Sequence, residues 1–143
     1  MPYSAKFEPD RKAGGYVVTF PDFPVGATQG ESFPEAMEMA QDMLKMILAD
    51  HIDTNRNLPP ARRHRGRNYH FVALPALQEA KVALYRAFRQ SGMRKSELAS
   101  RTGIQLANLN RLFDLDHASR LDQIETAFRA LGKQMRVEIE DAA

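Results

Sequence analysis

The stretch Lys95–Asp114 reads KSELASRTGIQLANLNRLFD, and its pattern predicts a helix-turn-helix. Two short helices that cross at a steep angle need a small residue in the first helix and a residue that tolerates positive φ in the turn. They also need apolar residues that hold the second helix in place. These positions are filled by Ala99, Gly103, Leu109 and Leu112, with Leu98 and Ile104 adding inward apolar contacts.

The outward side of the second helix carries side chains of the types that read base edges in a DNA major groove. Arg pairs with guanine there, and Asn or Gln pairs with adenine. We therefore expect DNA contacts from Ser96, Gln105, Leu106, Ala107, Asn108, Asn110 and Arg111. The alternative is a small helical hairpin whose polar residues contact only solvent. Arg94 stands where a Ser or Thr cap is common, which predicts a weak start of the first helix or a start shifted to Ser96.

The composition is that of a globular protein, with 43% hydrophobic residues and no cysteine among 143 residues. The lack of cysteine excludes disulfides, thiolate metal sites and cysteine nucleophiles. No apolar run approaches the roughly 20 residues that span a bilayer, and the N-terminus has no signal-peptide core. We therefore expect a cytoplasmic protein without a membrane partner.

Charge is divided unevenly along the chain, although the total is only +2. Residues 1–58 hold 5 Lys or Arg and 9 Asp or Glu, a net −4, whereas residues 59–143 hold 15 and 9, a net +6. A basic half suits phosphate binding, and an acidic half suits a basic protein partner. Solvated surfaces often differ in sign by this much, so the charge division alone does not identify a function.

The first 74 residues predict a small antiparallel sheet with one main helix. Strands are expected at 3–7, 16–20, 27–31 and 69–74, because these segments lie between turn residues and are mostly rich in β-branched and aromatic residues. Ser32, Pro34 and Glu35 predict the start of a helix that continues to about Ile52. Residues 53–68 predict a loop, since they include Pro59, Pro60 and the arginines Arg62, Arg63, Arg65 and Arg67. These arginines either contact solvent or reach a partner.

The apolar positions of the long helix recur at helical spacing and predict a face that covers the sheet. They are Ala36, Ala40, Met43, Leu44, Ile47 and Leu48. Met37, Met39 and Met46 lie outside this stripe. They either fill the edge of the core or form an adaptable apolar surface for a partner.

Two further helices are expected around the 95–114 stretch. The first begins after Pro75 and ends at Gly92, with Leu77, Ala80, Leu84 and Phe88 on its apolar side. The second is expected to be capped by Ser119 and to end at Gly132, with Leu121, Ile124, Phe128 and Leu131 on its apolar side. These helices predict a compact support for the helix-turn-helix.

The tail, residues 134–140, alternates strictly between polar and apolar residues, which is typical of a half-buried strand. Its apolar residues are Met135, Val137 and Ile139. A single strand has no partner within a helical domain, so we expect it to pair with the same strand of a second copy across a two-fold axis. A symmetric dimer also suits a helix-turn-helix that reads two half-sites.

The whole chain resembles the HicB-type antitoxins that carry a helix-turn-helix. The N-terminal likeness lies in GGYVVTFPDFP at residues 14–24, TQG at 28–30 and FPEAMEMA at 33–40. The C-terminal likeness lies in LPALQEAKVALYRAF at 74–88, SELASRTGI at 96–104 and LGKQMRVEIE at 131–140. This combination is more specific than a helix-turn-helix alone, which indicates only DNA binding.

The resemblance implies an α+β chain of two domains. Residues 1–74, with 53–68 as a loop, would form a partial RNase H-like domain: a small antiparallel sheet with one main helix. Residues 75–143 would form an all-α helix-turn-helix domain of the Cro/repressor type that ends in a short dimerising strand.

The resemblance also implies two partners. The N-terminal domain would neutralise a HicA-type toxin, a small basic ribonuclease that cleaves messenger RNA with a catalytic histidine. The C-terminal domain would repress the shared operon by binding double-stranded operator DNA as a homodimer or tetramer. The residues expected to contact the toxin are Asp22, Phe23, Pro24, Glu35 and Glu38. The alternative for residues 21–24 is that they only turn the chain.

A catalytic role is not expected. An RNase H-like nuclease needs several carboxylates around Mg²⁺, but the available acids fall in a turn, a loop and a helix cap: Asp10, Asp22, Glu31 and Glu35. The four histidines lack the spacing of metal ligands: His51, His64, His70 and His117. No cofactor or metal is therefore expected. The remaining alternative is a stand-alone repressor whose N-terminal domain senses a small molecule.

Overall fold

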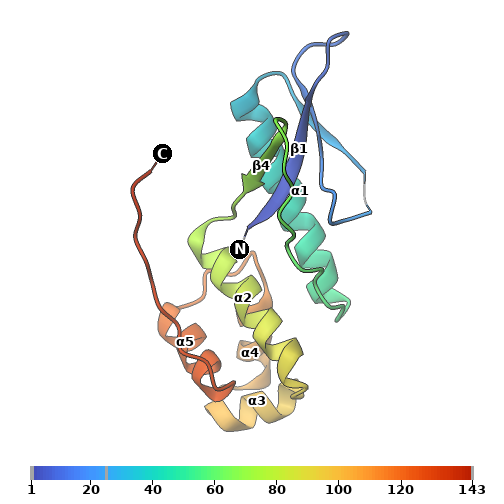
Figure 1. Cartoon of the computed structure of the whole chain (residues 1–143). Coiled ribbons are helices and arrows are strands. Elements are labelled where there is room, and N and C mark those ends of the chain that lie inside the picture. Colours follow the sequence, from blue (N-terminus) through green and yellow to red (C-terminus); the bar gives the residue numbers. More distant parts are fainter. Residues whose placement is uncertain (1, 25, 143) are drawn as a thin grey trace. The chain divides into compact units, whose positions relative to one another are not determined.

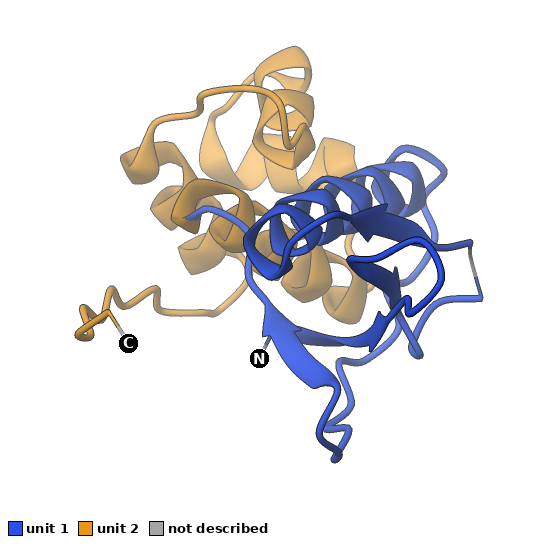
Figure 2. Ribbon diagram, turned by 90° about the horizontal axis from the view of Figure 1, so that it is seen from above, with its two compact units in different colours: residues 1–75 blue, residues 76–143 orange. Residues whose placement is uncertain are grey.

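A computed structural model describes residues 2–24 and 26–142 of the chain. The chain divides into two compact units, residues 1–75 and 76–143 (Figure 2). Within the described residues, unit 1 holds a four-stranded antiparallel sheet and one helix, and unit 2 holds four helices. The expected combination of a small sheet with helices is therefore confirmed. None of the helices in the described ranges is both long and apolar enough to cross a membrane.

The sheet of unit 1 has the strand order β3-β2-β1-β4 (Figure 1). The strands are β1 (Tyr3–Pro9), β2 (Tyr16–Thr19), β3 (Thr28–Gly30) and β4 (Tyr69–Val72), and each neighbouring pair is antiparallel. The register places Phe7 opposite Val18 and Tyr3 opposite Val72, and all four side chains are buried. The four predicted strands are confirmed, although β4 ends two residues earlier than expected.

Helix α1 (Phe33–Asp53) packs on one face of this sheet (Figure 1). Ser32 Oγ accepts a hydrogen bond from the Glu35 amide at 3.3 Å, and Pro34 lies in the first turn, so the predicted helix start is confirmed. The side toward the sheet buries Ala36, Ala40, Leu44, Ile47, Leu48 and Ile52. Strand β3 approaches α1 so closely at Gly30 that an added Cβ would lie 2.4 Å from the Ala36 amide nitrogen.

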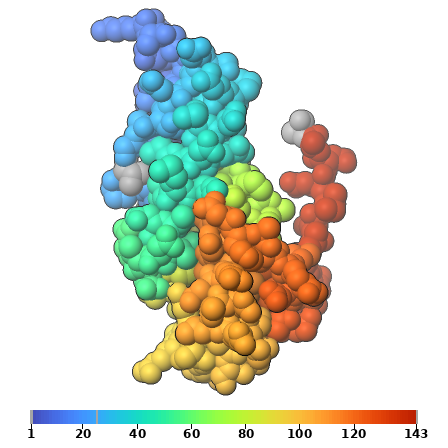
Figure 3. Space-filling model, turned by 180° about the vertical axis from the view of Figure 1, so that it is seen from behind, coloured from blue at the N-terminus to red at the C-terminus, as the bar shows by residue number. Residues whose placement is uncertain are grey.

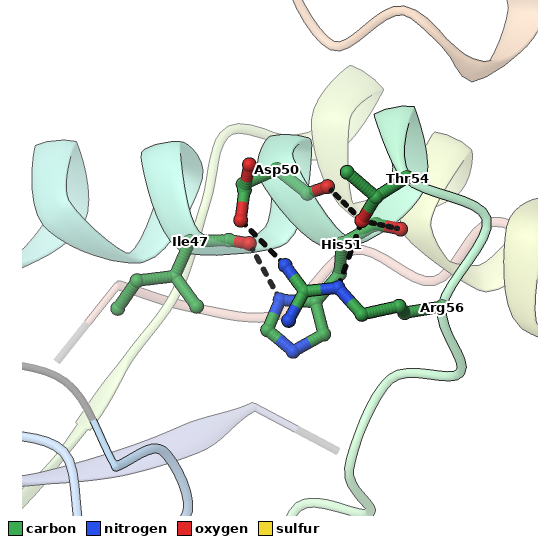
Figure 4. A network of polar contacts seen from close by, with 5 residues as sticks. All are labelled: Ile47, Asp50, His51, Thr54 and Arg56. Carbon is green, nitrogen blue, oxygen red and sulfur yellow. Dashed lines mark hydrogen bonds and ion pairs between the residues drawn. The ribbon is translucent and has the colours of Figure 1, made fainter.

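A polar network closes the C-terminal end of α1 (Figure 4). Thr54 Oγ1 donates a hydrogen bond to the Asp50 carbonyl at 2.7 Å, and Arg56 Nε donates to Thr54 Oγ1 at 2.8 Å. The Arg56 guanidinium also pairs with the Asp50 carboxylate. Side-chain contacts of this kind satisfy carbonyls that a helix end leaves without amide partners. The network therefore holds the start of the 53–68 loop against α1.

Unit 2 consists of α2 (Ala76–Ser91), α3 (Lys95–Thr102), α4 (Leu106–Phe113) and α5 (Leu121–Ala130). Gly103 ends α3 with a φ of +72°, and its amide donates a hydrogen bond to the Ala99 carbonyl at 3.0 Å, as expected of the turn. Arg94 precedes α3 and forms no side-chain cap, as expected, and α3 begins at Lys95 without the shift to Ser96. The buried side chains of the unit include Leu84, Tyr85, Phe88, Leu98, Leu109, Leu112, Phe113, Ile124 and Phe128.

The predicted cap of α5 is wrong. The residue before α5 is Arg120, and it forms no side-chain cap. Ser119 Oγ instead lies 2.7 Å from Lys81 Nζ, from which it accepts a hydrogen bond. A charged donor forms a stronger hydrogen bond than a backbone amide. The buried lysine therefore takes the hydroxyl that the local sequence pattern assigns to the helix.

The tail forms no strand in the single chain. Residues 134–140 follow α5 as an extended segment that has no strand neighbour among the described residues (Figure 1). A strand requires a hydrogen-bonded neighbour, and the described sheet contains only β3, β2, β1 and β4. The predicted pairing with a second copy therefore stays a prediction.

Candidate functional site

Helix α4 separates its side chains into a buried and an exposed set. Leu109, Leu112 and Phe113 are buried, whereas Gln105, Leu106, Ala107, Asn110 and Arg111 are exposed and Asn108 is half-buried. Ser96, on the first turn of α3, is exposed as well. Arg111 Nη1 donates a hydrogen bond to Asn108 Oδ1 at 3.3 Å, so these two polar groups lie side by side on one helix face. Every residue predicted to contact DNA thus has at least part of its surface accessible to a ligand.

A buried lysine supports this helix from within. Lys81 of α2 has no solvent exposure, and its Nζ donates hydrogen bonds to the carbonyls of Arg111 at 2.8 Å and Asp114 at 2.7 Å. Burial lowers the pKa of the Lys81 ammonium, and the Asp114 carboxylate raises this pKa by a smaller amount. Each of these carbonyls also accepts a backbone hydrogen bond at 3.2 Å, Arg111 from the Asp114 amide and Asp114 from the His117 amide, and Lys81 adds a charged donor at the helix C-terminus, where a cation is stabilising. Lys81 therefore fixes the end of α4 and with it the position of Arg111.

Sequence reasoning missed the role of Lys81. The available signal was its place in the apolar stripe of α2, since it lies four residues after Leu77 and three before Leu84. A lysine at such a position is buried only when several acceptors surround it. Those acceptors come from residues 111, 114 and 119, which only the tertiary structure brings to α2.

Two of the residues expected to contact a protein partner serve inside unit 1. Phe23 is 3% exposed, and its ring centroid lies 4.9 Å from that of Tyr3 and 5.7 Å from that of His51. The Asp22 side chain is 4% exposed and accepts hydrogen bonds from the Arg62 amide at 3.2 Å and His64 at 2.9 Å. These contacts anchor the 53–68 loop. Of residues 22–24, only Pro24 is well exposed.

The outer face of α1 combines acids with methionines. Glu35, Glu38, Met39, Asp42 and Met46 are all exposed, and their spacing places them along one side of the helix. Met46 is 73% exposed, so it does not fill the core. Flexible methionines beside carboxylates offer an adaptable, acidic contact surface. We call these five residues the α1 acidic face.

The acids considered for metal binding have other partners or lie apart. The Asp10 carboxylate accepts hydrogen bonds from the amides of Lys12 and Ala13, each at 3.1 Å, and Glu35 Oε2 accepts one from the Glu31 amide at 3.3 Å. Asp10, Glu31 and Glu35 border a cavity of about 400 Å³. In the described ranges, no group of three or more His, Asp or Glu side chains is placed to hold a metal ion.

The four histidines are spread over the chain and contact structural groups. His51 Nδ1 lies 2.9 Å from the Ile47 carbonyl (Figure 4), and His64 stacks on Tyr69 with ring centroids 5.5 Å apart. His70 packs edge-on against Phe7 and Phe33, and His117 Nδ1 lies 3.0 Å from Ser119 Oγ. These contacts orient each ring within its own unit.

The sequence of the chain is similar to those of known proteins. Residues 2–83 match a family model described as the HicB-like antitoxin of bacterial toxin-antitoxin systems. The chain is 39% identical to Antitoxin HicB of Escherichia coli K12 over an alignment of 125 positions, which covers 85% of this chain and 88% of that protein. It is 35% identical to Antitoxin HicB 1 of Photorhabdus laumondii over an alignment of 143 positions, which covers 98% of this chain and 88% of that protein.

A solved toxin-antitoxin complex from Streptococcus pneumoniae contains a chain that is similar over a shorter region. The sequence identity is 36% and the TM-score is 0.42, with 44% of this chain and 45% of that chain covered.

Proposed function

The chain belongs to the HicB-like antitoxins of bacterial toxin-antitoxin systems, and on that premise we propose that it has two binding functions. Unit 1, as a partial RNase H-like domain, binds and neutralises a HicA-type toxin that cleaves messenger RNA. Unit 2, as a Cro-type helix-turn-helix domain, binds operator DNA as a homodimer and represses the operon. The single observation that carries the proposal is that a chain of the antitoxin family also has, in unit 2, a helix whose accessible face holds Asn108, Asn110 and Arg111.

The proposed toxin contact is the α1 acidic face. A small basic ribonuclease presents a positive surface to RNA, and carboxylates of an inhibitor complement such a surface. Glu38 and Asp42 provide charge, and Met39 and Met46 provide apolar area that adapts to the partner. We place the contact here because Asp22 and Phe23 are occupied inside unit 1.

The general test is co-expression of the chain with the small basic reading frame beside its gene. We expect a stable complex in a pull-down and restored growth of cells that produce the toxin. No complex, or no restored growth, would contradict the toxin-binding function. A stand-alone repressor would then be the better interpretation.

Replacing Glu38 with Lys is expected to weaken toxin binding by roughly tenfold or more, because charge reversal turns an attractive contact into a repulsive one. Isothermal titration calorimetry with a toxin variant that lacks its catalytic histidine measures this effect. Asp53→Lys is the matched control, since Asp53 is an exposed acid at the other end of α1 and the change in net charge is the same. Equal weakening by both variants would mean that net charge, and not the α1 acidic face, governs binding.

Replacing Arg111 or Asn110 with Ala is expected to cost roughly 1 to 3 kcal/mol of operator binding, since each side chain would lose its contacts to a base edge. Fluorescence anisotropy with labelled operator DNA measures this cost. Arg129→Ala on α5 is the matched control for the loss of one exposed positive charge. Toxin neutralisation should be unchanged in all three variants. A loss of neutralisation equal to the loss of operator binding would contradict the division into two functional units.

A further inference from the structure

The side of unit 2 formed by α2 and α5 is an open apolar groove. It has a volume of about 560 Å³ and is lined by Leu77, Ala80 and Ala83 of α2, by Leu121 and Phe128 of α5, and by tail residues that include Met135 and Val137. Leu121 is more than half exposed at its edge. An apolar surface of this kind on a folded unit indicates that another segment covers it.

The tail lines this groove with Met135 and Val137 but leaves most of its apolar side exposed. Val137 is 68% exposed and Ile139 is 88% exposed. The last residues extend from the helices of unit 2 as a narrow column of side chains (Figure 3). A bare strand edge with exposed apolar residues favours pairing with another strand. The occupant that carries a complementary pattern is a second copy of the tail itself.

The charges of the tail select one register for such pairing. The residues from 133 to 141 read KQMRVEIED. In an antiparallel pair centred on Val137, Arg136 lies directly opposite the partner's Glu138, and the two-fold axis repeats this contact. Lys133 likewise lies opposite the partner's Asp141, and Met135 opposite the partner's Ile139. Directly opposite residues share a face and contact each other, so this register joins Arg136 to Glu138 on the polar face and Met135 to Ile139 on the apolar face, with Lys133 and Asp141 paired at the two ends of the apolar face.

The neighbouring registers place like charges together. A pair centred on Arg136 sets two arginines opposite each other, and a pair centred on Glu138 does the same with two glutamates. Parallel pairing in register makes like-charge contacts at both positions. A register that sets an odd-numbered residue opposite an even-numbered one would place apolar side chains opposite polar ones. The Val137-centred antiparallel register avoids all of these conflicts.

We infer that residues 133–141 of two copies form an antiparallel ribbon centred on Val137, held by reciprocal Arg136–Glu138 contacts, with its apolar side over the α2–α5 grooves. This inference rests on the homodimer of the proposed function and specifies how that homodimer is built. This explains why the tail is exposed in the single chain, because its strand neighbour is supplied only by the second copy.

Charge exchange in the full chain tests the register. Arg136→Glu or Glu138→Arg alone places two pairs of like charges in the ribbon, so the dimer dissociation constant is expected to rise by roughly 10- to 30-fold in low-salt buffer. The double variant R136E/E138R restores opposite charges and is expected to return to within about threefold of the original value. Sedimentation velocity measures both effects. Mixing the two single variants is expected to give mainly heterodimer, which native mass spectrometry detects.

Glu140→Arg is the matched control. Glu140 lies opposite Gln134 in the Val137-centred register, so dimerisation should be nearly unchanged, whereas a Glu138-centred register sets Glu140 opposite Arg136. Weakening by Glu140→Arg, or failure of the double variant to recover, would overturn the inference. Circular dichroism should give the same melting temperature for unit 2 at high salt in every variant, since these side chains are exposed.

The failures of the two proposals are distinguishable. If the chain dimerises but its dissociation constant does not change in the single charge variants, the ribbon is wrong and the homodimer remains valid. A chain of 16.2 kDa in solution would overturn both the ribbon and the homodimer. Deletion of residues 134–143 is expected to abolish dimerisation, and an unchanged mass by light scattering would overturn the ribbon. Toxin neutralisation, measured in parallel, should not depend on any tail variant, and its absence from the unaltered chain would contradict the proposed function alone.

Discussion

Replacing Lys81 with Met is expected to lower the free energy of unfolding of unit 2 by about 3 to 5 kcal/mol, because three hydrogen bonds from a buried ammonium are lost and the relief of its desolvation cost offsets only part of them. Methionine has a similar length, so little volume is lost. The carbonyls of Arg111 and Asp114 and the Ser119 hydroxyl would, however, lose a common donor inside the unit. Each carbonyl keeps a backbone partner, the Asp114 amide for Arg111 and the His117 amide for Asp114, so the loss is that of the hydrogen bonds from the ammonium, which contribute about 1.5 to 3 kcal/mol each when the donor is charged. Chemical denaturation followed by far-ultraviolet circular dichroism measures the loss.

The function of the Lys81→Met chain should change in only one unit. Operator binding is expected to be lost, because Arg111 and the end of α4 are no longer held, whereas toxin neutralisation by unit 1 should remain. Lys95→Met is the matched control, since Lys95 Nζ lies 5.7 Å from the Phe113 ring centroid and makes only a cation–π contact there. That variant is expected to lose no more than about 1 kcal/mol. Equal stability losses in the two variants would show that Lys81 has no special role.

Replacing Gly30 with Ala is expected to destabilise unit 1 by at least about 3 kcal/mol, the upper end of the cost of overpacking a core. The added Cβ would lie 2.4 Å from the Ala36 amide nitrogen and 2.6 Å from its Cα. Both atoms belong to the backbone of α1, so no side-chain rotation relieves the clash. Either β3 separates from β2 or α1 moves away from the sheet. Thermal unfolding measures the loss of stability.

Gly26→Ala is the matched control for Gly30→Ala. A Cβ at Gly26 meets no atom within 4 Å, and its backbone is outside the left-handed region. This substitution is expected to change stability by less than about 0.5 kcal/mol. The Gly30→Ala chain should fail to neutralise the toxin but should still bind operator DNA through unit 2. Normal toxin neutralisation with an unchanged melting temperature would contradict the predicted clash.

Most secondary structure follows from local chemistry and was predictable from the sequence. Ser32 and Pro34 start α1, and Gly103 provides the left-handed residue between α3 and α4. The apolar residues Tyr3, Ala5 and Phe7 of β1 are buried at a period of two, as predicted, although Ser4 between them is buried as well. In each case the decisive contacts involve residues a few positions apart. The residues that α4 exposes were predictable for the same reason, since helical spacing separates them from Leu109 and Leu112.

The candidate toxin contact was less predictable, because exposure depends on distant segments. The local pattern around Asp22 and Phe23 resembles a surface loop, but the carboxylate meets His64 and the ring meets Tyr3 and His51. Ser119 is similarly a plausible helix cap until Lys81 takes its hydroxyl. Met39 and Met46 were ambiguous between core and surface, and packing leaves both exposed.

The sequence by itself therefore determined the helices, the strands and the polar face of α4, since the forces that set them act within a few residues. Only the tertiary structure decided which polar groups are available to a partner. A buried charge such as that of Lys81 needs acceptors from 30 to 38 residues away. Close approach at Gly30 likewise depends on how a strand meets a helix. Hydrogen bonds and packing between distant segments carry no local signature, and they separate structural residues from binding residues in this protein.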